Sequence, residues 1–161
     1  MDTEIIKKNW TTYKTILNRL GDENIDNLLE KLGQRLCIAP ANSNNKQYGC
    51  YAGGIVVTST KLAKAMQALN EFHGTPVDIK SVYKVGLLHD IGRIGTMTDD
   101  WLLPQDSDWH REKLGNEFKV NFDLPKMTHL QRTMFLLNQF QVKLTEEEFF
   151  EEVGSMMEEE L

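Results

Sequence analysis

The chain has 161 residues, 40% of them hydrophobic and 26% charged, with a formal net charge of -6, so a single domain with one core is expected over residues 1–161. The negative charge argues against non-specific binding of nucleic acid. An apolar run of roughly 20 residues and a basic, apolar leader are both missing, which predicts a cytoplasmic protein without a membrane segment.

The first third of the chain predicts two helices and a loop. Apolar residues recur at helical spacing over 5–20, and Gly21 follows where a helix end is expected. A second helix is expected over about 24–36. Residues 39–47 are rich in proline, asparagine and serine, which predicts a loop, and the glycines and tyrosines of 48–54 indicate a structured continuation of it.

Two helices are expected in the middle of the chain. The first begins near residue 58, and its apolar stripe includes Leu69 and Phe72. The second takes Pro76 as its first residue and ends near Gly92. The apolar run 55–57 is too short to predict a strand.

The remainder of the chain predicts a long connection and two more helices. The connection, 93–126, contains a short helix near 110–118, and a segment of this length is more often functional than idle. Its tryptophans, Trp101 and Trp109, are candidates for a lid or a partner surface.

The first of these two helices is expected over 127–140, and the last begins after Thr145, which forms a capping box with Glu148. The fold class predicted from the whole pattern is all-α, with five to six main helices.

The most chemical segment is the end of the fourth predicted helix, where an apolar run finishes in His89 and Asp90, followed by Gly92 and Arg93. A capped helix end with a hydrogen-bonded histidine would give the same dipeptide. The run Leu-Leu-His-Asp-Ile-Gly-Arg resembles the signature of the HD superfamily of metal-dependent phosphohydrolases, Leu-Leu-His-Asp-hydrophobic-Gly-Lys.

The resemblance extends over about residues 36–157. Residues 39–41 and 48–54 are similar to the loop that precedes the family's first metal ligand, and 127–133 and 144–148 are similar to its later helices. The chain resembles a degenerate member of the family, similar to small bacterial and phage HD proteins. The resemblance implies a single HD-like helical domain.

Members of this family hold one or two divalent ions with histidines, the His-Asp pair and a later aspartate. Three positions where the family carries a histidine are occupied here by residues that are poor ligands for a transition metal: Thr58, Tyr48 and Ser155. The final aspartate is also missing, and Glu158, Glu159 and Glu160 are the residues available to replace it.

By resemblance, the surviving metal ligands are His89, Asp90 and His129, with His89 and Asp90 as the catalytic pair and Arg93 as a phosphate contact. This set would hold at most one divalent ion (Mn, Mg, Zn or Fe), weakly or not at all. His129 also fits a partly exposed helix residue, and His110 fits a surface loop residue better than a member of the site.

Two functions follow. In the first, the chain has lost hydrolysis and binds a nucleotide or a protein partner. In the second, it is an active metal-dependent phosphohydrolase on a nucleotide or phosphomonoester, with water activated by the ion. The lost ligands favour the first, so enzymatic activity is not the leading expectation. The sequence sets no oligomeric state, and Cys37 and Cys50 are expected to be reduced, packed thiols.

Overall fold

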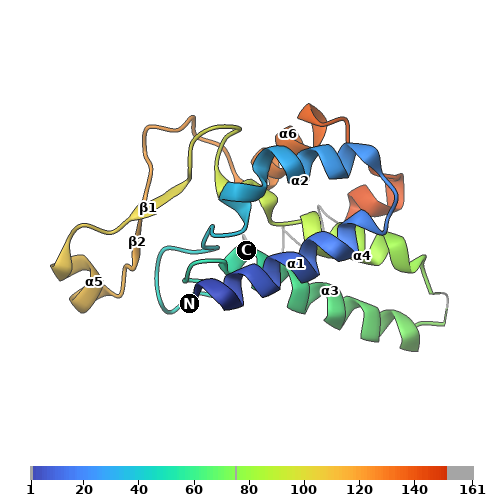
Figure 1. The fold of residues 1–161 in the computed structure, drawn as a ribbon, viewed down its shortest axis with the longest axis horizontal. Coiled ribbons are helices and arrows are strands. Elements are labelled where there is room, and N and C mark those ends of the chain that lie inside the picture. The colour runs from blue at the N-terminus through green and yellow to red at the C-terminus, as the bar shows by residue number, and fades with distance from the viewer. Residues whose placement is uncertain (1, 75, 152–161) are drawn as a thin grey trace.

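The computed structural model describes residues 2–74 and 76–151 (Figure 1). Over these residues the chain is mostly helical. Its elements in chain order are α1 (Thr3–Asn18), α2 (Glu23–Leu36), α3 (Gly54–Phe72), α4 (Ile79–Leu88), the 3-10 helix η1 (Ile91–Ile94), β1 (Leu102–Pro104), α5 (Asp108–Leu114), β2 (Phe118–Val120) and α6 (His129–Gln139). A further helical segment covers 146–151.

The helix starts follow from side-chain caps. Asp2 and Asp22 accept hydrogen bonds from the first backbone amides of α1 and α2, and Asp78 does the same for α4. Thr128 and Gln131 form a reciprocal capping box at the start of α6. These caps satisfy amides that have no partner within their own helix, so they fix where each helix begins.

The core is built from α1, α2, α3, α4, η1 and α6, and α2 contributes the most buried side chains to it. Its largest fully buried side chains include Tyr13, Leu28, Leu32, Ile55 and Leu87. Burial of one such side chain contributes roughly 1.5–3 kcal/mol. α3 and α4 pack along each other, and η1 packs against α6, so the end of α4 lies at the centre of the molecule.

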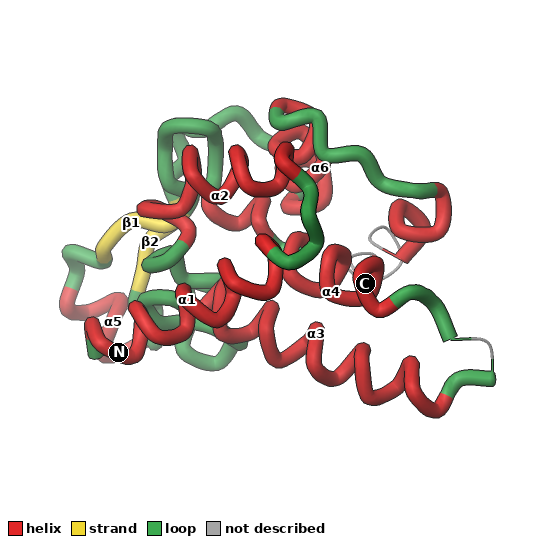
Figure 2. Tube along the Cα trace, turned by 45° about the vertical axis from the view of Figure 1, so that its right-hand side comes forward, coloured by secondary structure: helices red, strands yellow, loops and turns green. Residues whose placement is uncertain are grey.

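The all-α expectation is correct for most of the chain but wrong for the connection 93–126. Strands β1 and β2 pair antiparallel, with Leu102 opposite Val120 and Pro104 opposite Phe118. Figure 2 shows this single short ladder beside an otherwise helical chain. Strands of three residues with mostly half-buried side chains have too little alternation to be detected from the sequence.

The strands and α5 form a projecting arm. Figure 1 shows β1, β2 and α5 extending away from the helical body, and α5 buries none of its residues. The short helix predicted near 110–118 is therefore present, but it begins at Asp108, where Ser107 caps it.

Two predicted helix starts are also wrong. α3 begins at Gly54 rather than near residue 58, so 55–57 is helical and the chain turns into the helix at Gly53, whose φ is +84°. α4 begins at Ile79 rather than Pro76, because Asp78 supplies the cap. The end of α3 also departs from its predicted stripe, since Leu69 and Phe72 are 72% and 90% exposed.

Two further observations concern the described residues. None of their helices is both long and apolar enough to cross a membrane. Cys37 and Cys50 are free thiols, as predicted, and burial raises the pKa of both.

Candidate functional site

The candidate site lies where α4 ends and η1 begins. Leu87 and Leu88, the last two residues of α4, are buried in the core, and His89 is the C-cap of the helix. The Nδ1 atom of His89 lies 2.8 Å from the Gly86 carbonyl oxygen. Because a carbonyl oxygen only accepts, Nδ1 carries the proton, and Nε2 faces the site, 3.5 Å from Asp90 Oδ2.

Asp90 is the most buried ionisable residue of the site, 1% exposed, and each of its carboxylate oxygens has a donor. Arg93 Nε donates to Oδ1 at 2.9 Å, and the Tyr48 hydroxyl donates to Oδ2 at 3.1 Å. A charge in the interior is strongly unfavourable unless it is paired and hydrogen-bonded. Arg93 therefore compensates the negative charge of Asp90, and Tyr48 provides a hydrogen bond to its second oxygen.

Arg93 is held as an internal cation. It is 7% exposed, and its Nη1 atom donates to the Ala41 carbonyl and to Asn42 Oδ1, both at 3.1 Å. Its guanidinium carbon also lies 5.2 Å from the centroid of the Tyr48 ring, within the range of a cation–π contact. The guanidinium thus joins Asp90 and η1 to the loop 41–53.

Hydrogen bonds within the loop 41–53 hold Tyr48 in its position at the site. The Ala41 amide donates to the Gly49 carbonyl, and the Asn42 side chain donates to the Tyr48 carbonyl. Gly54 lies so close to Gly49 that an added Cβ would be 2.0 Å from the Gly49 oxygen. Only glycine permits this approach, so the glycines of the loop fix its shape.

Thr58 lies in the first turns of α3, and its hydroxyl is used by the helix. Its Oγ1 donates to the Gly54 carbonyl at 2.8 Å. This is the usual back-bond of a threonine inside a helix. The position where the HD resemblance places a metal ligand is thus a hydroxyl bonded to its own backbone.

Thr133 fastens α6 to the site from the opposite side. Its Oγ1 accepts from the Gly92 amide at 3.0 Å and donates to the His89 carbonyl at 3.2 Å. A Cβ on Gly92 would lie 2.4 Å from the carbonyl oxygen of His129. Gly92 therefore allows the backbone contact that brings α6, with His129 at its start, against η1.

His129 completes the cluster as a neutral imidazole. Desolvation and the nearby Arg93 guanidinium lower its pKa to about 4, although Asp90 opposes the shift. Its ring meets the Trp101 ring edge-on, with centroids 4.3 Å apart, and its buried Nδ1 has no hydrogen-bond partner. Trp101 is held there by its own amide, which donates to the Ile94 carbonyl.

Whether these residues fit a divalent ion can be judged from the donors. Asp90 gives its two oxygens to Arg93 and Tyr48, and Thr58 gives its proton to the backbone. Among the residues described, no three His, Cys, Asp or Glu side chains lie close enough together to hold an ion. The arrangement does not fit a metal centre, because the Arg93 guanidinium is already paired with Asp90, the carboxylate that the ion would need as a ligand.

The structure brings together most of the residues predicted for the site: Tyr48, His89, Asp90, Arg93 and His129. His110 lies outside it, exposed on α5 and close to Ser107. The metal and phosphate roles of these residues stay predictions, and Ser155 and Glu158 to Glu160 lie outside the described residues.

Three residues of the site were not predicted as members: Asn42, Trp101 and Thr133. Asn42 accepts from the Arg93 side chain, and Thr133 bonds to the backbone of His89 and Gly92. These partners are 41 or more residues away, so they leave no local signal in the sequence. Trp101 is predicted as part of a lid or partner surface, which stays a prediction, and in the structure its ring lies against His129.

Comparison of the chain with models of protein families, with curated proteins and with solved structures finds no match in any of the three.

Proposed function

We propose that the chain is a degenerate HD-like protein that has lost hydrolysis and acts by binding a nucleotide or a protein partner. This proposal rests on the observation that both carboxylate oxygens of Asp90 already accept hydrogen bonds from side chains of the protein. A buried guanidinium 2.9 Å from Oδ1 supplies the positive charge that a divalent ion would otherwise supply, and Tyr48 takes the second oxygen.

The energetics favour this state. Arg93 keeps its positive charge, since a guanidinium is not deprotonated in a protein. An incoming ion would have to separate a buried ion pair and also displace three further contacts of Arg93, to Ala41, Asn42 and the Tyr48 ring. The displaced guanidinium, which is 7% exposed, would then lie in the interior without its carboxylate, and an unpaired buried charge is strongly unfavourable.

One observation favours the second candidate, an active metal-dependent phosphohydrolase acting on a nucleotide or phosphomonoester. Because Nδ1 of His89 donates to the Gly86 carbonyl, Nε2 is the ring nitrogen left facing the site, and in the neutral ring it offers the lone pair that a metal ligand requires. In this candidate His89, Asp90 and His129 would be the ligands and Arg93 would contact phosphate. Arg93 and Tyr48 would first have to leave Asp90.

Hydrolysis assays separate the two candidates. The purified chain is incubated with p-nitrophenyl phosphate and with the four ribonucleoside triphosphates, with Mn²⁺, Mg²⁺ or Zn²⁺ added in turn. We expect the wild type to release phosphate no faster than the Asp90→Asn variant does. A metal-dependent rate that is lost in Asp90→Asn but kept in the surface variant Asp108→Asn would overturn the proposal.

A further inference from the structure

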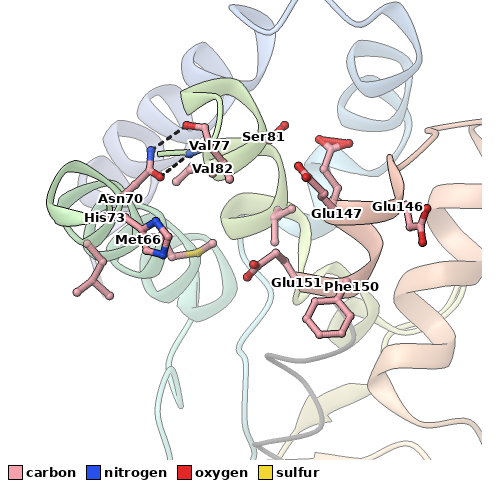
Figure 3. A pocket seen from close by; sticks show the side chains of 13 residues that line it. Met66, Asn70, His73, Val77, Ser81, Val82, Glu146, Glu147, Phe150 and Glu151 are labelled. Carbon is pink, nitrogen blue, oxygen red and sulfur yellow. Dashed lines mark hydrogen bonds between the residues drawn. The ribbon is translucent and has the colours of Figure 1, made fainter. Parts of the chain in front are cut away.

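A concavity lies at the C-terminal end of α3, and none of its lining residues belongs to the candidate site. It has a volume of about 790 Å³ and is enclosed by the end of α3, by α4 and by the helical segment 146–151 (Figure 3). Its floor is apolar, with Met66, Val82 and Val85 among the lining residues. We call it the α3–α4 groove.

The walls of the α3–α4 groove are held in place by polar contacts. The Asn70 side chain exchanges two hydrogen bonds of 2.9 Å with the Val77 backbone, which ties the end of α3 to the start of α4 (Figure 3). On the other side, Lys84 pairs with Glu148 at 3.0 Å and donates to the Lys143 carbonyl. Glu148 also closes the capping box with Thr145. The groove is therefore preformed.

Large apolar side chains stand exposed along its edges. Leu69 is 72% exposed and Phe150 is 75% exposed, and both line the groove. Phe72, the last residue of α3, is 90% exposed. These side chains keep apolar surface in water that burial against a partner would remove. Exposed apolar side chains that line one groove mark an interaction site more often than apolar side chains scattered singly over a surface.

The rim is acidic. Glu146, Glu147 and Glu151 line the groove and are exposed, and its lining contains neither lysine nor arginine. The carboxylate of Glu148 is already paired with Lys84. An apolar floor with carboxylates along one edge is complementary to a helix that has one apolar face flanked by cationic side chains.

We infer that the α3–α4 groove binds an amphipathic helix of a partner protein, with apolar side chains against Met66, Leu69 and Val82 and with lysines or arginines facing Glu146, Glu147 and Glu151. The inference specifies the partner of a binding protein as a cationic amphipathic helix. It holds whether or not Asp90 ever meets a metal, so its failure and the failure of the proposed function can be told apart.

The test uses a fluorescent 14-residue helical peptide of leucine and lysine, with leucines at helical spacing on one face, and a matched peptide with glutamate in place of lysine. Fluorescence anisotropy with the full chain should show saturable one-to-one binding of the cationic peptide, weaker at higher salt, and no binding of the acidic one. Equal binding of both peptides, or binding of neither, would overturn the inference.

Matched variants locate the binding. Leu69→Ser and Glu147→Lys should each weaken it about tenfold, because they remove burial and reverse one charge. The same changes on α5, Leu114→Ser and Glu112→Lys, should leave it unchanged, since both residues are exposed on the projecting arm. Groove and control variants that behave alike would refute the assignment.

Two other occupants are distinguished by the same material. Light scattering that shows a dimer in the wild type and a monomer in Leu69→Ser would assign the groove to a second copy of the chain. Peptide binding that appears only after Met156→Glu and Met157→Glu are introduced together would assign it to residues 152–161. Either result overturns the proposed partner.

Discussion

Substitution of Arg93 by methionine tests the internal cation directly. Methionine keeps an unbranched apolar stem but leaves the carboxylate of Asp90, which is 1% exposed, without its cationic partner. Breaking a buried ion pair on one side costs about 3–5 kcal/mol. In a chain of this size that corresponds to a fall in Tm of roughly 10 °C.

The assay is urea unfolding at pH 7, followed by circular dichroism, in a double-mutant cycle with Asp90→Asn. The double variant should recover a large part of the loss, because the buried charge is then absent. Arg111→Met is the matched control. Arg111 makes the same i,i+3 pair with Asp108, but at the surface, with side-chain exposures of 37% and 84%, so a loss of at most about 1 kcal/mol is expected.

The reasoning is refuted if Arg93→Met costs no more than Arg111→Met. It is also refuted if the loss is the same in the Asp90→Asn background, since the two residues would then not interact.

Two further predictions concern the contact of α6 with the site. Gly92→Ala should destabilise the chain by about 1–3 kcal/mol or more in the same urea assay, because its Cβ would lie 2.4 Å from the His129 carbonyl oxygen, whereas Gly74→Ala, with open space around it, should cost much less. His129 has a folded-state pKa of about 4 against 6.5 in the unfolded chain, so the unfolded state takes up a proton first and stability falls between pH 6.5 and 4. Over that range the wild type should lose about 3 kcal/mol more than His129→Gln; equal losses would mean that the imidazole is not desolvated.

The sequence predicts the helical architecture well where caps and periodicity agree. α2 differs from its predicted range by one residue, because Asp22 caps it and its apolar face is continuous. α6 and the capping box of Thr145 also lie where they were expected. Errors arise where a tertiary contact overrides a local signal: Gly54 begins a helix instead of ending a loop, since it packs against Gly49.

The candidate site shows the same division. The sequence predicts which residues form the cluster, because each one is singled out by its position in a motif: His89, Asp90, Arg93 and Tyr48. The hydrogen bonds within the cluster are not predicted, since nothing in the sequence around Tyr48 indicates that its hydroxyl reaches Asp90, 42 residues away. The exposure of Leu69 is likewise invisible in the sequence, because helical periodicity does not show whether a neighbour covers the stripe.

The central claim is that the Arg93 guanidinium occupies the carboxylate a divalent ion would need. The most direct measurement is the metal content of the purified chain by mass spectrometry, with Mn²⁺, Mg²⁺ and Zn²⁺ titrations of the wild type and of His89→Ala side by side. The account predicts no stoichiometric ion and the same weak titration for both proteins. About one ion per chain in the wild type, lost in His89→Ala, would contradict it.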